Sequence, residues 1–326
     1  MGQAALQMVT SPRSRSMLTE VELSIKEYLI CKKQEGLSAG TIGKYSEHLK
    51  RLAVWLAGRG VTAPNQLEKR ILREWGASLH DVMGPATVRL AVASAKCWLR
   101  WLLAENLISD DLAEVLKSPK VKKKVQRTLG GDEIEKMMAS CDLSTALGLR
   151  DAALMSLLTD SGLRASEVCR LKVEDLEWDV EVLPGVKVNR FPVLIKGGNT
   201  LPGYFGQRTG DLIKQWLAVR KPLARGEKAL FISLGGTRPF TSLTRSGLHN
   251  AIAERGDLAG VKGASPHTFR RAFACLLASA GSSDRGIMEL GRWADLTMVL
   301  LYTRGWAAGA TYPQFSPLDY LANKKG

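Results

Sequence analysis

Five residues spread over the second half of this chain are of the types needed to break and reseal a phosphodiester bond. They are Arg164, His267, Arg270, Trp293 and Tyr302, in that order. Two guanidiniums match the charge of a phosphate, an imidazole can carry a proton, an indole can donate one hydrogen bond, and a phenol can act as a nucleophile. No set of metal-ligating residues accompanies them in the sequence. The pattern therefore indicates phosphate chemistry with no metal site.

Two of these residues would be positioned by the start of a helix. Ser265 suits an N-cap and Pro266 suits the first helical position, so His267 and Arg270 would lie one turn apart on one face. The exposed amides of a helix N-terminus favour an anion, and a guanidinium and an imidazole there would make a phosphate pocket. A surface histidine and arginine beside a helix cap are the plainer interpretation when this motif is taken alone.

The remaining positions also have plain interpretations. Arg164 follows a glycine suited to end a helix, and it could simply pair with Glu167 three residues later. Tyr302 follows the apolar run 296–301, which is closed by Thr-Arg-Gly, and a tyrosine there is usually half-buried packing. Trp293 would by default belong to a core. Only the complete set points to a site.

A hairpin is predicted between these motifs. The valine-rich segment 182–195 is followed by a Lys-Gly-Gly-Asn sequence beginning at Lys196 and by a second short extended run through Phe205. Two glycines between extended segments are typical of a hairpin turn, which would carry Lys196 at its shoulder. Helices are expected around it at 132–140, at 147–159 and from 210 onward. The second half is therefore predicted to be mostly helical with a small antiparallel sheet.

Residues 17–116 have apolar side chains at three- and four-residue intervals, which predicts a bundle of about four or five helices. The expected helices span 18–32, 38–56, 64–79 and 85–103. Ser38 would be the N-cap of the second helix. Trp98 and Trp101 fall on or beside the apolar stripe of the last helix and are expected in the core. Basic residues that could face DNA phosphates are Lys44, Lys50, Arg51, Arg89, Lys96 and Arg100.

Composition favours a polyanionic partner. The chain has 326 residues, 45% of them hydrophobic, and a net charge of +14, which suits two globular domains that bind nucleic acid. A soluble basic protein with a solvated surface is the alternative. Residues 117–127 hold six basic residues, no acidic residue and a proline, which predicts an interdomain linker. Its lysines Lys122, Lys123 and Lys124 could follow DNA phosphates.

The cysteines and the chain start favour the cytoplasm. Five cysteines lie far apart with no pair at metal-ligand spacing, as expected of buried thiols in a reducing compartment. The first residues lack the pattern of a signal peptide, and no apolar run approaches a membrane-spanning length. We therefore expect a soluble cytoplasmic protein with no membrane partner.

Five motifs occur in the order and at the spacing typical of one enzyme family. They are Thr-Asp-Ser-Gly-Leu-Arg164-Ala-Ser-Glu167, the hairpin Lys196, His267-Thr-Phe-Arg270, Leu-Gly-Arg-Trp293 and Leu-Leu-Tyr302-Thr-Arg. With them the chain resembles, over nearly its whole length, the tyrosine recombinases, the phage-integrase-like family of site-specific DNA strand exchangers. Single motifs are weak, whereas five in the family's order are a strong signal.

The resemblance implies a mainly α fold, with a helical core-binding domain before an α+β catalytic domain and a small antiparallel sheet. The implied segments are a flexible N-terminus at 1–16, the core-binding domain at 17–116, the basic linker at 117–127, the catalytic domain at 128–304 and a tail at 305–326. The tail would dock onto a neighbouring subunit or fold onto its own domain. Implied partners are double-stranded DNA recombination sites, bound as a homotetramer on two duplexes, with an accessory directionality factor as a further candidate. No cofactor, metal or ATP is implied.

The resemblance also assigns the steps of cleavage. Tyr302 would attack the scissile phosphate, giving a 3′-phosphotyrosyl bond and a free 5′-hydroxyl, while Arg164 and Arg270 hold the non-bridging oxygens. Lys196 would protonate the departing 5′-oxygen. His267 would accept the phenol proton or orient the phenol.

Two further positions complete the implied site. Glu167 would support Arg164 or His267. Trp293 stands where many members carry a second histidine, nine residues before the tyrosine, and Arg292 beside it misses that spacing by one. An indole can donate a hydrogen bond to a phosphate but cannot shuttle a proton. Proton transfer would therefore fall to Lys196 and His267.

Three other protein classes compete with this interpretation. A type IB topoisomerase would use a similar residue set to relax supercoils without a paired site. A non-catalytic DNA-binding regulator would explain the charge and the helices but not the five-part set. A metal-dependent nuclease or transposase would need a carboxylate cluster, which the sequence does not supply. Integration, excision and dimer resolution share one active site, so the sequence does not choose among them.

Overall fold

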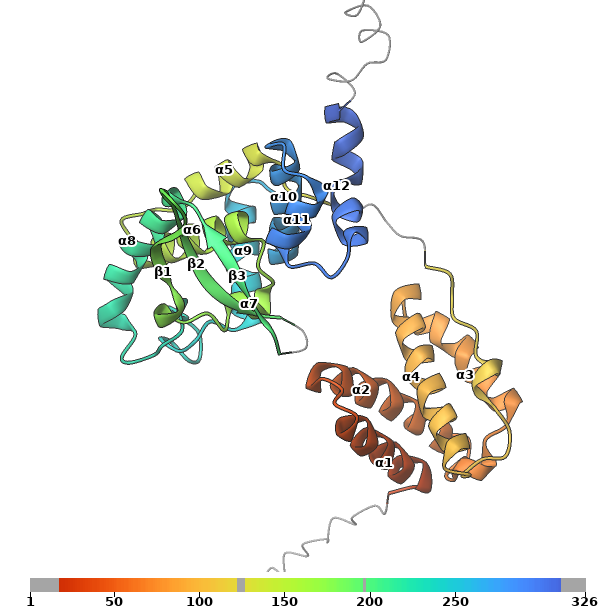
Figure 1. The fold of residues 1–326 in the computed structure, drawn as a ribbon. Helices are drawn as coiled ribbons and strands as arrows, with labels where there is room; N and C mark the ends of the chain where they lie inside the picture. Colours follow the sequence, from red (N-terminus) through yellow and green to blue (C-terminus); the bar gives the residue numbers. More distant parts are fainter. Residues whose placement is uncertain (1–17, 122–126, 196–197, 312–326) are drawn as a thin grey trace, which may run out of the picture. The chain divides into compact units, whose positions relative to one another are not determined.

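The computed structural model describes residues 18–121, 127–195 and 198–311, with side chains described up to residue 303. The chain divides into two compact units, Met1–Lys124 and Val125–Gly326, each with its own hydrophobic core. Figure 1 labels the helices and strands of both units.

The first unit, as far as residues 18–121 describe it, is a bundle of four α-helices. They are α1 (Glu20–Gln34), α2 (Ala39–Ala57), α3 (Lys69–Val82) and α4 (Pro85–Ala104), with 3₁₀ turns η1 (Pro64–Gln66) and η2 (Ala113–Val115). The apolar stripes of α2 and α4 meet in a core that includes Leu49, Leu52 and Trp98, all fully buried. Trp101 is half-buried against the same core. The Ser38 hydroxyl accepts a hydrogen bond from the Thr41 amide at 3.3 Å, which confirms the predicted N-cap.

The single helix predicted over 64–79 is wrong. A 3₁₀ turn ends at Gln66, and α3 begins only at Lys69 because Leu67 and Glu68 are extended. The Gln66 side chain closes the turn by accepting hydrogen bonds from the amides of Thr62 and Ala63, at 2.8 and 3.1 Å. Leu67 then buries its side chain in the bundle core. A local side-chain cap and a tertiary contact thus override the helical period.

The second unit is mostly helical with one small sheet, as the sequence predicts. Its elements are α5 (Gly131–Ala139), α6 (Ala146–Ser161), α7 (Ala165–Val168), η3 (Val173–Asp175), β1 (Glu177–Leu183), β2 (Val186–Leu194), β3 (Thr200–Phe205), α8 (Gln207–Leu223), α9 (Arg245–Leu258), α10 (Pro266–Ser279), α11 (Asp284–Gly291) and α12 (Leu296–Thr311). Helix α6 is buried on nearly all sides and contacts α8, α9, α10 and β3. Burial on nearly all sides is typical of a helix at the centre of a core.

The sheet is an antiparallel meander in the order β1, β2, β3. The single extended segment predicted over 182–195 is wrong, because a turn at Pro184-Gly185 divides it into the end of β1 and the whole of β2. Proline and glycine favour such a turn. The predicted hairpin itself is present as β2 and β3, with Pro192 opposite Pro202.

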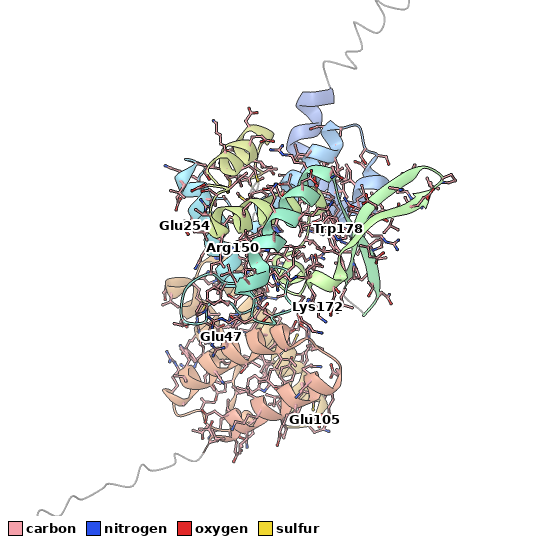
Figure 2. The ribbon with its side chains drawn as sticks, turned by 90° about the vertical axis from the view of Figure 1, so that its left-hand side faces the viewer. Glu47, Glu105, Arg150, Lys172, Trp178 and Glu254 are labelled. Carbon is pink, nitrogen blue, oxygen red and sulfur yellow. The ribbon has the colours of Figure 1, made fainter. Side chains whose placement is uncertain are left out.

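A buried ion cluster ties two helices of this unit together. Asp151 on α6 accepts hydrogen bonds from Arg150 at 2.9 and 2.7 Å and from Arg255 on α9 at 2.8 Å. All three residues are buried, and Arg150 lies in the interior of the unit (Figure 2). Removing the carboxylate would leave two buried guanidiniums without a counter-charge, so we assign this cluster to the fold.

Helix α12 carries Tyr302 and continues to Thr311, so the Thr-Arg-Gly sequence at 303–305, which closes the apolar run, does not end the helix. Of the helices in the described part of the chain, none combines the length and the apolar character needed to cross a membrane.

Candidate active site

The start of α10 places two of the predicted site residues. Ser265 is the N-cap, its hydroxyl accepts from the Thr268 amide at 3.3 Å, and Pro266 occupies the first helical position. His267 is exposed on the first turn, whereas Arg270, one turn later, is only 2% exposed. The local prediction for this helix start is therefore confirmed. It brings an accessible imidazole and a buried guanidinium to the same end of one helix.

Arg270 is held by the backbone of two distant segments. One terminal nitrogen, Nη1, donates to the carbonyl of Gly162 at the end of α6, and Nη2 donates to the carbonyl of Gly291 at the end of α11, at 2.7 Å. A guanidinium suits this task because its two terminal nitrogens lie in one fixed plane and each can serve one carbonyl. Arg270 therefore draws the C-terminal ends of α6 and α11 together beneath the start of α10.

The two glycines that accept these bonds are required by close packing. Gly162 has a φ of +57° and ends α6 in the left-handed region, and a Cβ there would lie 2.4 Å from the Phe273 ring. A Cβ on Gly291 would lie 2.0 Å from the ring of Trp293. Both separations are far below ordinary carbon–carbon contact. The glycines of the Ser-Gly-Leu-Arg and Leu-Gly-Arg-Trp motifs thus let aromatic rings approach the backbone that holds Arg270.

Arg164 follows Gly162 and caps the short helix α7. Its Nη1 donates to Oε1 of Glu167 at 2.7 Å, and its backbone amide donates to Oε2 of the same carboxylate at 2.7 Å. The Arg164 side chain is 48% exposed, while that of Glu167 is 5% exposed. A buried carboxylate therefore fixes one side of a guanidinium that stays open to a ligand.

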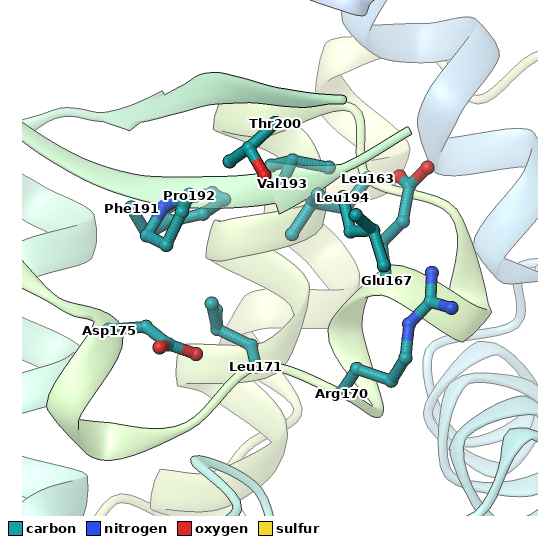
Figure 3. A pocket seen from close by; sticks show the side chains of 10 residues that line it. All are labelled: Leu163, Glu167, Arg170, Leu171, Asp175, Phe191, Pro192, Val193, Leu194 and Thr200. Atoms are coloured by element: carbon teal, nitrogen blue, oxygen red, sulfur yellow. The ribbon is translucent and has the colours of Figure 1, made fainter. Parts of the chain in front are cut away.

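A cavity of about 290 Å³ lies beside Glu167. It opens between the α7–η3 segment and the outer part of the hairpin, and Figure 3 shows Leu171, Phe191 and Leu194 facing it from both sides. Its lining is Leu163, Glu167, Arg170, Leu171, Asp175, Phe191, Pro192, Val193, Leu194 and Thr200. The hairpin is thus separated from the segment that carries Arg164 on this side.

The ring of Trp293 lies close to both the guanidinium of Arg270 and the phenol of Tyr302. The indole is 4.6 Å from the guanidinium carbon of Arg270 and 5.6 Å, centroid to centroid, from the ring of Tyr302. Trp293 and Tyr302 are 7% and 8% exposed and belong to a small apolar cluster formed by α10, α11 and α12. The Trp293 Nε1–H is buried and has no hydrogen-bond acceptor among the described residues. It is a donor without a partner, placed beside Arg270.

His267 also lies beside the phenol of Tyr302. The rings of His267 and Tyr302 meet edge to face, with centroids 6.1 Å apart and an angle of 83°. Although the residue is exposed, partial burial of its ring lowers the pKa of His267 below its ordinary value, and the charges of Arg271, Arg270 and Arg164 lower it further. The imidazole is therefore neutral at pH 7 and can accept a proton.

The electrostatics of the site favour an anion. Burial lowers the pKa of Arg270 to about 10, and the charge of Arg164 adds to that effect, so the two guanidiniums repel each other across the site. Among the residues that the structure describes, Glu167 is the only carboxylate that raises the pKa of Arg270 or Arg292. Buried positive charge in excess of its counter-charge is unfavourable until an anion neutralises it. A phosphate meets this need, and forked donors match its oxygens.

Two further arginines belong to the site region, and neither was among the predicted catalytic residues. Arg271 is buried and donates to the carbonyl of Arg127 at 2.8 Å, which fastens the start of the second unit to α10. The phenol of Tyr302 raises the pKa of Arg271, so the two groups are close. Arg292 is buried, and its hydrogen-bond acceptors in the described part of the chain are the backbone carbonyls of Ser161, Pro202 and Leu290. Only distant contacts reveal these roles, and residue type and spacing do not encode them.

The structure describes most, but not all, of the predicted residues. Lys196 and the linker lysines Lys122, Lys123 and Lys124 lie outside the described residues, as does the tail from 312. The predicted DNA-contacting residues of the first unit lie on α2 and α4, and all are exposed except Lys96, which is half-buried. Arg51 pairs with Glu47 at 2.8 Å and Arg100 with Glu114 at 2.9 Å. Exposed pairs of this kind are weak, so a phosphate can compete for either arginine.

Comparison with known proteins identifies relatives over most of the chain. The family model "Phage integrase family" matches residues 127–307. The chain is 32% identical to tyrosine recombinase XerD of Ralstonia nicotianae, over 83% of this chain and 85% of the relative. It is 29% identical to tyrosine recombinase XerC of Corynebacterium efficiens, over 91% and 90% of the two chains.

Solved structures share the fold at low identity. The XerH site-specific recombinase bound to its palindromic difH substrate has a TM-score of 0.65 and 19% identity, covering 86% of this chain and 81% of that one. A lambda integrase dimer bound to a core site has a TM-score of 0.64 and 17% identity, covering 86% and 94%. Both structures thus share the fold of this chain over most of its length.

Proposed function

Because this chain belongs to the phage integrase family of tyrosine recombinases, we propose that its site cuts and rejoins DNA through a covalent bond to Tyr302. Membership makes the chain a DNA strand-transferring enzyme that acts in site-specific recombination. The observation that carries the proposed site is the place of Trp293, whose ring contacts both Arg270 and Tyr302. A phosphate held by Arg270 would therefore lie within reach of the phenol.

Cleavage is an exchange of one phosphate ester for another. The Tyr302 oxygen bonds to phosphorus while the bond from phosphorus to the 5′-oxygen breaks, which leaves a 3′-phosphotyrosyl ester and a free 5′-hydroxyl. Strand exchange reverses these steps when the 5′-hydroxyl of a partner strand attacks the phosphotyrosine. The ester linkage is conserved throughout, so no external energy source is needed.

Two proton transfers accompany the exchange. The phenol of Tyr302 loses a proton, and His267 accepts it, since the ring is neutral at pH 7 and edge-on to the phenol. The departing 5′-oxygen gains a proton from Lys196, which the sequence places between β2 and β3. Trp293 has no proton to exchange at this pH, so it serves only as a hydrogen-bond donor and a wall.

The arginines stabilise the charge that grows on the phosphate. The exposed guanidinium of Arg164, held by the buried carboxylate of Glu167, donates to the phosphate. Arg270 donates through the N–H groups that do not bind its two carbonyl partners. The Trp293 Nε1–H finds its acceptor in a non-bridging oxygen. Preorganised donors aimed at a developing charge are the largest single contribution in many enzymes, each worth about 3–4 kcal/mol.

Strand exchange requires one cut strand in each of two duplexes, so at least two active sites must act together. We assign this chain to a homotetramer on two double-stranded sites, with its exposed basic residues on α2 and α4 against phosphates. A lambda integrase tetramer bound to a Holliday junction shares the fold, with a TM-score of 0.64 and 17% identity, and supports this assignment.

The test is covalent capture on a nicked duplex. Duplexes would be selected from a random pool by binding to the Tyr302→Phe protein, and a nick beside the scissile phosphate would let the cleaved fragment diffuse away. The wild-type protein should accumulate a protein–DNA adduct that survives a chelator, and Tyr302→Phe should form none. Failure of the wild-type protein to form an adduct on any selected duplex would refute the proposal. Relaxation of plasmids that lack a selected site would favour a topoisomerase instead.

A further inference from the structure

Three residues of α10 lie on one face of the helix, each four positions from the next. They are His267, Arg271 and Cys275. Residues four apart in an α-helix are neighbours on its surface, so the three side chains form one row along α10. We call this row the α10 stripe. Its first and last members both contact one residue of α12.

The side chain of Tyr302 extends along the α10 stripe. The thiol of Cys275 donates to the backbone carbonyl of Tyr302, with 3.3 Å between Sγ and the oxygen. Two turns away, the ring of His267 meets the ring of Tyr302 edge to face, with centroids 6.1 Å apart. Residue 271 occupies the position between these two contacts. The Arg271 side chain therefore lies beside that of Tyr302.

The guanidinium of Arg271 is fixed by the backbone. Arg271 is 7% exposed, and its Nη1 donates to the carbonyl of Arg127 at 2.8 Å. Arg127 is itself tied to α5, because its Nη2 donates to Oε1 of Glu133 at 2.6 Å. The nitrogens of a guanidinium lie in one plane, so this bond restricts the direction of the whole group. The positive charge thus has a fixed place on the α10 stripe.

The charge of Arg271 acts on the phenol and on the imidazole. Burial lowers the pKa of Arg271 and the phenol of Tyr302 raises it, as expected for a cation close to that phenol. Burial also lowers the pKa of His267, and Arg271 is the charge that lowers it most. Arg270 and Arg164 contribute less. These charge effects agree with the place that the α10 stripe gives to the guanidinium.

We propose that Arg271 is a positioning residue for cleavage: it supports the side chain of Tyr302 and, through its charge, keeps His267 ready to accept the phenol proton. The inference rests on the proposed function, in which Tyr302 attacks the phosphate and His267 is the proton acceptor. A cation beside a neutral imidazole disfavours the imidazolium, so the acceptor stays proton-free to a lower pH. Arg271 transfers no proton itself, because arginine stays protonated.

The pH dependence of cleavage separates this role from a merely structural one. A weakened fold slows adduct formation by a similar factor at every pH. Loss of a positive charge beside His267 instead raises the pKa of the imidazole, so the acidic fall in rate moves to higher pH. The charged and titratable groups around the imidazole are Arg270 and Arg271 on α10, Arg164 before α7 and Tyr302 on α12. Variants at residue 271 leave the other three in place.

Two variants at residue 271 separate charge from hydrogen bonding. Arg271→Gln removes the charge and keeps an N–H group for the carbonyl of Arg127, whereas Arg271→Lys keeps the charge and loses the planar fork. Arg220→Gln is the matched control, because Arg220 is equally buried, at 6%, and its guanidinium likewise donates to backbone carbonyls. Arg220 lies on α8, outside the α10 stripe. Thermal unfolding of each variant reports whether the fold is retained.

We expect Arg271→Gln to shift the acidic fall in the rate of adduct formation to higher pH. At pH 7 this variant should be about 10- to 100-fold slower than the wild-type protein, since a misplacement of about 1 Å can cost 100-fold. Arg271→Lys should keep the fall at the wild-type pH because the charge remains. Arg220→Gln should keep it there too, whatever its effect on Tm. Arg271→Gln combined with His267→Asn should show no acidic fall, since the imidazole is the titrating group.

Each other outcome has a distinct meaning. A folded Arg271→Gln whose acidic fall stays at the wild-type pH, or whose rate at pH 7 is that of the wild-type protein, would overturn the role of Arg271. An equal shift in Arg220→Gln, or a fall that persists without His267, would overturn it as well. If Arg271→Gln fails to fold, Arg271→Lys decides, because a fall at higher pH despite the retained charge contradicts the proposal and an unshifted fall supports it. Absence of a wild-type adduct would instead refute the proposed function itself.

Discussion

The contact between Gly291 and Trp293 makes Gly291→Ala a sharp test of how the site is packed. A methyl group at residue 291 would lie 2.0 Å from the Trp293 ring, so the ring must retreat by roughly 1.5 Å to regain an ordinary carbon–carbon contact. That movement changes the distances from the indole to Arg270 and to Tyr302. Misplacement on this scale costs on the order of 100-fold in rate.

The same substitution has a predicted cost in stability. Inserting a methyl group into a well-packed cluster destabilises by about 1–3 kcal/mol, which lowers the Tm of a unit of this size by roughly 2–10 °C. Adduct formation on the nicked duplex and thermal unfolding measure the two effects. Gly131→Ala is the matched control, because its Cβ would meet only a Leu276 methyl group at 3.9 Å. It should change neither quantity appreciably.

A double substitution separates packing from chemistry. Trp293→Phe removes the ring atoms that clash, so Gly291→Ala combined with Trp293→Phe should be more stable than the two single effects summed. Cleavage should stay slow in the double variant, since phenylalanine has no N–H to donate. Cleavage by Gly291→Ala at the wild-type rate would refute the packing described for Trp293. A double variant whose change in stability equals the sum of the two single changes would refute it as well.

Three further predictions follow from the site and the basic surface. Because the pKa of His267 is lowered, the rate of adduct formation should fall on the acidic side only below pH 6.5, where the imidazole gains a proton and can no longer accept one. His267→Asn should remove this acidic fall from the pH–rate profile. Glu167→Gln should slow adduct formation by about 10- to 100-fold, because each hydrogen bond to a charged group contributes about 1.5–3 kcal/mol to holding Arg164. An unchanged rate on the nicked duplex would show that Glu167 does not hold Arg164 in place for cleavage. Lys44→Ala should reduce the slope of log affinity against log salt concentration by about 0.9 in a binding titration. Glu47→Gln is the control on the same helix. An unchanged slope for Lys44→Ala would show that Lys44 does not contact a DNA phosphate.

The sequence predicts best what is encoded locally. The cap at Ser265 and the proline after it define a helix start within a few residues, so the placement of His267 and Arg270 on its first turns could be foreseen. The glycine that ends α6 just before Arg164 is equally local. The mainly helical architecture followed in the same way from apolar spacing.

What the sequence does not predict depends on contacts between distant residues. The carbonyl partners of Arg270 are 108 and 21 residues away, and those of Arg292 reach 131 and 90 residues away. The break before α3 has a similar cause, since burial of Leu67 in the bundle overrides the helical period. Spacing carries no signal for such contacts, and only the fold brings them together.

The most direct test of the central claim is to identify the residue that becomes attached to DNA. Trypsin cleaves after Arg292 and Arg304, so Tyr302 lies in a peptide spanning 293–304 that contains no other tyrosine. Mass spectrometry of the digested adduct, after the DNA is trimmed to a nucleotide, should find that peptide carrying a 3′-phosphate ester on Tyr302. A nucleotide attached to any other peptide, including those that contain Tyr312 or Tyr320, would contradict the account.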